Sequence, residues 1–419
     1  MFKYKQVLTL VVMAATAVTA AACSSSGSPA SAGSPASTGS SASAASSTPF
    51  TILMDADFTG PGKSYGDQFQ LGVQAAADYI NQTRGGILGH KIAVKTVSDN
   101  FDATQAVSAL IKYLSSNPAP NLTFAGTGDT ETAALFPILQ RKGLLGWSGN
   151  DGGGLLGNGG AQKLSLQFSS QASTVPVTQK VVQWMQQQHF SHVGILQEDN
   201  AYSAAETADA EKAITAAGMT DTVVTFSTTA LNLSAQVQEL QHAGSNVVFF
   251  EGLTQPFGYG IQAARTSLGW NVPWIVDLSA SSLDLTTVAT AAQLKNVYEI
   301  NFRPNVAGVN LPGLTLLRQY AASLTSIGTL NAVPFDIAAL GWDGVLMVAN
   351  AAEQAKSIGA TAIAQALDNF GSGANDPDYL DYAKISFAAN DHTPVSATPN
   401  DYPIVKAGPI RNAQVQPPS

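Results

Sequence analysis

The chain has 419 residues, a net charge of −9, and charged side chains at only 12% of its positions. Its 20 lysines and arginines are scattered, which argues against nucleic-acid binding, because proteins of that class gather basic residues on one face. A single cysteine, Cys23, excludes an intrachain disulfide framework.

The start of the chain is predicted to be a targeting segment. Two lysines precede an apolar run from residue 7 to residue 18, and alanines at 20–22 end it. The run is too short to span a membrane and has the pattern of a secretory signal peptide over residues 1–22. Cys23 at the cleavage point, followed by serines, resembles a bacterial lipoprotein signal, in which the thiol is lipidated. We therefore predict an extracytoplasmic protein anchored to the cell membrane by lipid on Cys23.

The segment from 23 to 48 is predicted to be a flexible tether. After Cys23 it contains only Ser, Ala, Gly, Pro and Thr, which cannot form a core. The chain beyond it is too long for one compact core, so we expect two domains.

Strands and helices are predicted to alternate through the first part of the body. Short apolar or alternating runs indicate strands, and apolar residues at helical spacing indicate helices. The expected strands are 52–54, 92–97, 122–125 and 144–147, and the expected helices are 69–80, 106–114 and 132–142. This alternation is typical of a parallel sheet with right-handed crossovers.

The same plan restarts after a glycine-rich interruption at 152–160. The expected helices are 177–189, 203–217, 233–243 and 257–267, and the expected strands are 193–196, 223–226, 247–250 and 274–276. A later, strongly apolar segment, 335–355, is predicted to be a helix that packs against a sheet. The sequence thus predicts two α/β units of similar size.

Polar loops follow the predicted strands. In open parallel sheets, ligands bind beyond the carboxyl ends of the strands. In the first half, the polar residues at these strand ends are Asp55, 60–66, 126–132 and 148–151. In the second half, they are 198–202, 251–254 and Asp277. Two such edges that face each other would form a cleft for a small ligand.

These residues, in this order, resemble the type I periplasmic solute-binding proteins, in the branch that serves branched-chain amino acid ABC transporters. The matching segments are 59–66, 72–92, 99–106, 126–132, 199–203, 385–387 and 402–405. The resemblance implies an α/β fold of two doubly wound parallel-sheet lobes joined by a three-crossing hinge. Lobe I is expected at 49–170 plus about 302–388, and lobe II at 171–301 plus about 389–419.

The resemblance also implies what the protein binds and what it does not do. The expected partners are a small polar ligand (an amino acid or an amide-like compound) and an ABC transporter permease. We expect a monomer without catalysis, cofactor or metal.

Ligand-binding residues are carried over from the resemblance position by position. It places Tyr65 beside the ligand, the Thr130 hydroxyl on the ligand carboxylate, Tyr202 over the opposite side, and Asp277 on the ammonium group. The strand-end loops add Asp129, Asn150, Asp151 and Thr254 to the predicted ligand-binding residues.

Acids in the predicted site depart from the family pattern. Asp129, Glu131 and Asp151 stand where a ligand carboxylate would approach, and two unit charges about 4 Å apart repel by a few kcal/mol in a protein environment. One hypothesis is a neutral polar or cationic ligand instead of an aliphatic amino acid. The alternative is that these acids cap the helices that follow and do not face the cleft.

Other signals favour structural interpretations. The glycine pattern at 152–157 follows a fourth strand, not a first one, so we interpret it as a loop and not as a dinucleotide site. His189 and His192 lie at a helix end without further metal ligands nearby. The tryptophans are expected in the core, although Trp147, just before a cleft loop, could touch ligand.

Three functions follow from this interpretation. Transport binding is favoured, and a ligand-sensing lipoprotein of the same fold acting on a signalling receptor is the alternative. An enzyme is weakly supported, because the sequence contains no evident catalytic constellation.

Overall fold

The computed structural model describes residues 48–150, 154–157, 160–324, 334–370 and 376–416. The predicted signal peptide, Cys23, the tether up to residue 47, and Asp151 therefore lie outside the described residues. Residues 152, 153, 158 and 159 of the glycine-rich interruption lie outside them as well.

The first sheet is entirely parallel, with the strand order β2-β1-β3-β4-β5. Its strands are β1 (Phe50–Ala56), β2 (Ile92–Ser98), β3 (Leu122–Ala125), β4 (Gly146–Ser148) and β5 (Gln167–Ser169). The helices between them are α1 (Lys63–Thr83), α2 (Ala103–Ser116) and α3 (Asp129–Arg141). The predicted alternation is confirmed, but β5 was not predicted, because three residues carry no readable periodicity.

The second sheet has the order β11-β10-β9-β8-β6-β7 and is parallel except for β11, which runs antiparallel to β10. Its strands are β6 (His192–Glu198), β7 (Thr220–Phe226), β8 (Val247–Glu251), β9 (Trp274–Val276), β10 (Val297–Ile300) and β11 (Ile404–Lys406). The helices of this part are α4 (Thr174–Gln187), α5 (Ala201–Ala216), α6 (Ser234–His242), α7 (Thr254–Gln262), which continues as a π-helical turn (Ala263–Ser267), and α8 (Leu278–Ser281).

The chain passes three times between the parts built on the two sheets, as the resemblance implies. It leaves the first sheet after β5 and leaves the second after β10. It then forms α9 (Pro312–Ala321), α10 (Asp336–Ala355) and α11 (Ala360–Asp368). Both α9 and α10 pack on α1, so this segment returns to the first sheet before β11 rejoins the second. The fold is thus the predicted pair of parallel α/β sheets, and the lobe boundaries given above stay predictions.

Short elements complete the described chain. They are the 3₁₀ turns Gly160–Gln162, Leu285–Thr287, Arg303–Asn305 and Pro399–Asp401, and the hairpin of β12 (Ile410–Arg411) and β13 (Gln414–Val415).

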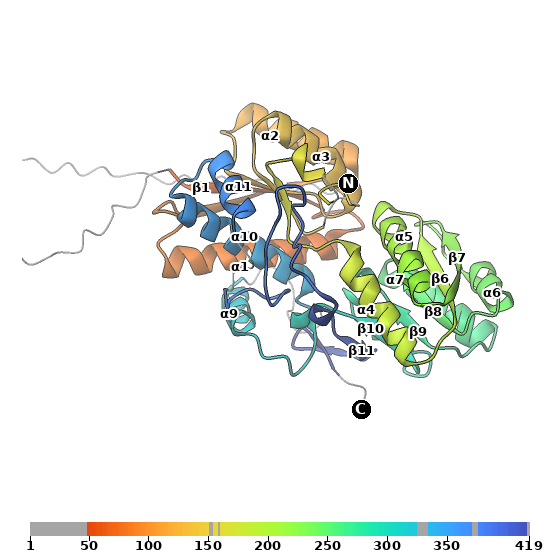
Figure 1. Ribbon diagram of the computed structural model, residues 1–419. Coiled ribbons are helices and arrows are strands. Elements are labelled where there is room, and N and C mark those ends of the chain that lie inside the picture. The colour runs from red at the N-terminus through yellow and green to blue at the C-terminus, as the bar shows by residue number, and fades with distance from the viewer. Residues whose placement is uncertain (1–47, 151–153, 158–159, 325–333, 371–375, 417–419) are drawn as a thin grey trace, which may run out of the picture. The chain divides into compact units, whose positions relative to one another are not determined.

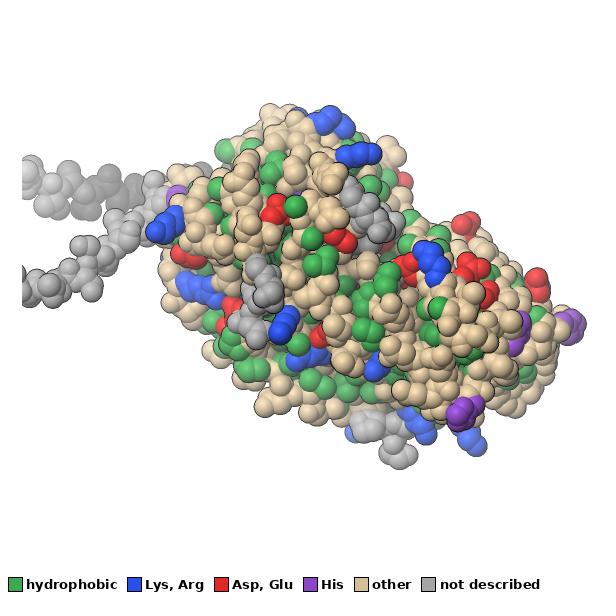
Figure 2. Space-filling view, in the orientation of Figure 1, with side chains coloured by type: hydrophobic (Ala, Val, Ile, Leu, Met, Phe, Trp, Pro, Cys, Tyr) green, Lys and Arg blue, Asp and Glu red, His purple; other side chains and the backbone are tan. Residues whose placement is uncertain are grey.

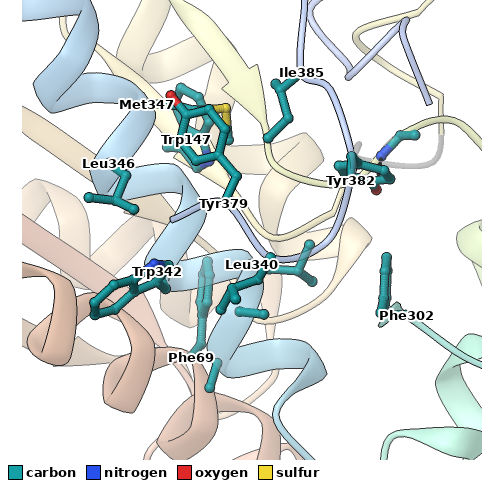
Figure 3. Packing of buried hydrophobic residues seen from close by; sticks show 14 of the residues in the cluster. Phe69, Trp147, Phe302, Leu340, Trp342, Leu346, Met347, Tyr379, Tyr382 and Ile385 are labelled. Atoms are coloured by element: carbon teal, nitrogen blue, oxygen red, sulfur yellow. Dashed lines mark hydrogen bonds between the residues drawn. The ribbon is translucent and has the colours of Figure 1, made fainter. Parts of the chain in front are cut away.

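The closest helix contact joins α1 and α10, which run side by side in Figure 1. A Cβ atom added at Gly72 of α1 would lie 1.8 Å from the carbonyl oxygen of Ala338 in α10. Only glycine permits this approach. The contact draws Phe69 and Trp342 into the core drawn in Figure 3.

Trp147 packs in the core. Its ring is fully buried and stacks on Phe168 with ring centroids 5.9 Å apart. Its indole N–H donates to Ser170 Oγ at 2.7 Å. Trp274 and Trp342 are fully buried too, which confirms the predicted core packing of these rings.

On the face drawn in Figure 2, lysine and arginine side chains are spread apart and form no single basic patch. No helix within the described ranges combines the length and the apolar character needed to cross a bilayer.

Two neighbouring residues of α2 test this packing. Leu110 is fully buried, whereas the side chain of Ile111 is 52% exposed. We expect Leu110→Ala to lower the free energy of unfolding by about 2–5 kcal/mol, because it leaves a cavity. Ile111→Ala, the matched control, should cost about 0.5 kcal/mol or less. Urea unfolding measures both, and equal costs would contradict the burial described here.

Candidate functional site

Buried acids line the carboxyl edge of the second sheet. Glu198 ends β6, Glu251 ends β8, and Asp277 directly follows β9, so the parallel strands bring all three to one edge. Glu206, one turn into α5, joins them. The four side chains are between 0% and 1% exposed. This is the edge at which ligands bind in open α/β sheets.

Each of these acids lacks part of the hydrogen bonding that buried carboxylates need. Asp277 caps α8 by accepting the Ala280 N–H at 2.9 Å, and Glu198 accepts the Leu253 N–H at 2.9 Å. The Thr207 hydroxyl donates to Glu251. The atoms without a hydrogen-bond partner among the described residues are Glu198 Oε1, Glu206 Oε1 and Oε2, Glu251 Oε1, and Asp277 Oδ2.

The electrostatics of this group favour its neutral forms. Burial raises the pKa of Asp277 to about 7, and it raises the pKa values of Glu206 and Glu251 well above their ordinary range. The charge of Asp277 raises both of the latter further. None of the ion pairs formed by described residues involves these acids. A positively charged group brought to this edge would therefore find carboxylates without a competing cation.

Two tyrosines from different parts of the fold reach the acids. The pKa of Tyr65, on α1, is raised first by burial and then by Asp336 and Asp277, while a hydrogen bond with Thr254 lowers it. The pKa of Tyr202, on α5, is raised by burial, then by Glu206 and by Asp277. Asp277 thus lies close enough to both phenols for its charge to act on them.

The structure brings together five of the predicted residues. Tyr65, Tyr202, Thr254 and Asp277 are linked by the interactions above, and the charge of Asp129 acts on Tyr202. Thr254 begins α7, is 2% exposed, and donates its hydroxyl proton to the Ala280 carbonyl at 2.9 Å.

Two further predicted residues, Thr130 and Asn150, are not part of this linked group. Thr130 is exposed in the first turn of α3. Asn150 is buried, and its backbone N–H donates to Ser148 Oγ at 3.2 Å. Neither is joined to the acids by the interactions described above, and Asp151 lies outside the described residues.

Glu131 has the capping role of the alternative interpretation. Its Oε2 accepts the backbone N–H of Gly128 at 3.1 Å at the start of α3. This carboxylate is therefore used by its own helix.

Glu206 was not predicted as a site residue. The available signal was its spacing, because residues four apart share one face of a helix, and Glu206 follows Tyr202 by four positions on α5. Glu198 and Glu251 were recognised as polar strand ends without an assigned role.

A second group of acids lies at the carboxyl edge of the first sheet. Asp55, near the end of β1, is fully buried, and neither of its carboxylate oxygens has a hydrogen-bond partner among the described residues. Burial, followed by the charges of Asp99 and Glu131, raises the pKa of Asp55 to about 8. Asp57 differs, because it accepts the backbone N–H groups of the turn that follows at 2.9, 2.5 and 2.7 Å.

Comparison with known proteins agrees with this architecture. Residues 49–407 match a family model described as periplasmic binding protein. The Leu/Ile/Val-binding protein BraC3 of Rhizobium johnstonii is 44% identical over 64 residues, which cover 15% of this chain and 17% of that protein. The Leu/Ile/Val-binding protein homolog 3 of Brucella melitensis is 28% identical over 204 residues, which cover 48% of this chain and 54% of that protein. The chain thus matches about half, or less, of the length of these curated relatives.

A solved structure shares the fold. The periplasmic binding protein type 1 from Bordetella pertussis superposes with a TM-score of 0.72 at 17% identity, covering 88% of this chain and all of that chain.

Because Asp55 of β1 is a buried acid, we expect its contribution to the free energy of unfolding to depend on pH. An acid whose pKa is raised on folding stabilises the native state most below its unfolded pKa of about 4, and this contribution is lost as the pH rises toward 8. Asparagine does not titrate. We therefore expect Asp55→Asn to become progressively more stable, relative to the wild-type chain, from pH 4 to pH 8.

Urea unfolding at pH 4, 6 and 8 tests this expectation. Asp57→Asn is the matched control and should destabilise at pH 8, because its amide offers fewer acceptors to the backbone N–H groups that Asp57 binds. A stability difference for Asp55→Asn that stays constant with pH would contradict the prediction.

Proposed function

The chain belongs to the periplasmic binding protein family, and we propose that it is an extracytoplasmic solute-binding lipoprotein that delivers a small polar ligand to an ABC importer. The ligand is an amino acid or a related compound, held between the parts built on the two sheets. The observation that carries this proposal is that Tyr65 of α1 lies close to Thr254, which begins α7, and to Asp277, which follows β9.

The chemistry of these residues suits an amino compound. Asp277 offers a carboxylate oxygen without a hydrogen-bond partner in the described chain, which matches a ligand ammonium group. The phenols of Tyr65 and Tyr202 cover the ligand from two sides. Thr130 and Asn150, with Asp151, are proposed to bind its carboxylate end.

We assign the protein a binding role and not a catalytic one. A family of binding proteins, together with a site made of acids and phenols, supports capture of a ligand more than its turnover. The names of the two curated relatives place leucine, isoleucine and valine among the ligands to test.

Membrane attachment is proposed to depend on Cys23. In cells, we expect Cys23→Ala to move the protein out of the membrane fraction and to abolish labelling by radioactive palmitate, because the thiol that carries the lipid is gone. Ser24→Ala should change neither result. A Cys23→Ala chain that stays labelled and membrane-bound would contradict the lipoprotein assignment.

Ligand binding is proposed to depend on Asp277. Asp277→Asn should weaken binding by about 10- to 100-fold, the effect of losing one charge-assisted hydrogen bond of about 1.5–3 kcal/mol. Isothermal titration calorimetry measures this effect. Asp102→Asn is the matched control, since Asp102 also caps a helix, α2, but is exposed.

Uptake of labelled ligand by cells tests the transport role. Cells without this protein should lose uptake, and the wild-type gene should restore it where the gene for Asp277→Asn does not. Unchanged uptake in cells without the protein would contradict delivery to an importer.

A further inference from the structure

The site holds more acids than one amino group requires. A zwitterionic amino acid presents one ammonium, and Asp277 can bind it with its second oxygen. Glu206 and Glu251 are also fully buried, and their carboxylates lie near enough to Asp277 for its charge to raise their pKa values. Of the four acids at this edge, Glu198, Glu206 and Glu251 therefore remain after the ammonium is bound.

Glu206 is the least satisfied of these acids. Both of its carboxylate oxygens are buried without a hydrogen-bond partner in the described chain. It lies one helical turn after Tyr202 on α5, and its charge raises the pKa of that phenol more than any other charge does. Its side chain therefore faces the place where the Tyr202 hydroxyl is proposed to cover the ligand.

Within the described part of the chain, the charged and titratable groups around Glu206 offer it no cation. The carboxylates of Asp277, Glu251 and Asp209 act on it, and it acts in turn on the phenols of Tyr202 and Tyr402. The nearest lysine on this helix, Lys212, is bound to Asp209 at 2.9 Å.

The other two glutamates of the edge differ in how the fold holds them. Glu198 accepts the Leu253 N–H at 2.9 Å and so supports the loop after β8. Glu251 is oriented by the Thr207 hydroxyl, which occupies one oxygen and leaves Oε1 without a partner. The charge of Glu251 also raises the pKa of Glu206, so the two carboxylates lie near each other.

We propose, building on the proposed function, that the ligand carries two positively charged groups, one bound by Asp277 and the other by Glu206 together with Glu251. A buried carboxylate is stable only when it is paired, hydrogen-bonded or protonated. A second cation on the ligand would pair with the Glu206 and Glu251 carboxylates, for which the described chain provides no cation. The ligand class is a small diamino compound. A basic amino acid and a simple diamine share this chemistry.

An aliphatic amino acid fits these residues less well. Its side chain forms no hydrogen bond, so it would cover Glu206 and leave both carboxylate oxygens without a partner. A leucine-type ligand therefore uses Asp277 alone.

Calorimetry on the full mature chain in detergent tests the proposal with matched ligands. L-Lysine carries both ammonium groups and a carboxylate, cadaverine carries the two ammonium groups alone, and L-norleucine lacks the second ammonium. We expect lysine or cadaverine to bind at least 100-fold more tightly than norleucine. If lysine binds more tightly than cadaverine, the site is one for a basic amino acid. If cadaverine binds as tightly as lysine, the site is one for a diamine.

Two glutamate variants locate the second cation. Glu206→Gln should weaken lysine or cadaverine binding by about 10- to 100-fold and leave norleucine binding unchanged. Glu239→Gln, at an exposed position of α6, should change neither. Circular dichroism of Glu206→Gln separates a lost contact from a lost fold.

The pH dependence of binding is a second readout. A cation binds ionised carboxylates, so the affinity for lysine should rise from pH 5 to pH 8, and this rise should be smaller in Glu206→Gln. Binding of leucine or norleucine as tight as that of lysine would overturn the two-cation inference and leave the proposed function intact. Failure of every one of these compounds to bind would overturn both.

Discussion

A buried carboxylate must be paired, hydrogen-bonded or protonated, and this constraint governs the site of this protein. The parallel strands of the second sheet place Glu198, Glu251 and Asp277 together at one carboxyl edge. Burial then makes the charged forms of Glu206, Glu251 and Asp277 costly. Their high pKa values let protons neutralise these acids while the site is empty, and a positively charged group would stabilise the ionised forms instead.

The backbone distinguishes the acids that serve the fold from those available to a ligand. Asp57 accepts backbone N–H groups at the turn after β1, Glu131 caps α3, and Asp343 accepts the N–H groups of Leu380 and Asp381. These carboxylates have structural partners. Glu206 has none in the described chain, although it is as deeply buried. The number of acids near a site is thus less informative than the partners that each acid has.

Much of the fold was predictable because its longer elements carry a local period. The strands around Ile52 and Val193 and the helix at 336–355 were expected from sequence alone. The short strands β5, β10 and β11 were not, and β11 pairs with β10 across about a hundred residues of chain, so this pairing has no local signal. For the site, Asp277 and Tyr65 came from the family resemblance. Placing Glu206 beside Glu251 requires knowing how α5 packs against β8 in three dimensions.

Under the proposed function, the charges of these acids explain how closure of the two parts would depend on the ligand. While the parts built on the two sheets are apart, water solvates the carboxylates, and their negative charge attracts a cation. Bringing those parts together without a ligand would bury several like charges, each pair costing about 4 kcal/mol at 4 Å and an effective dielectric of 20. A ligand cation removes that penalty, so its differential affinity for the closed form shifts the population toward closure. On this argument, the acids that make the empty site unfavourable are what make closure specific to a positively charged ligand.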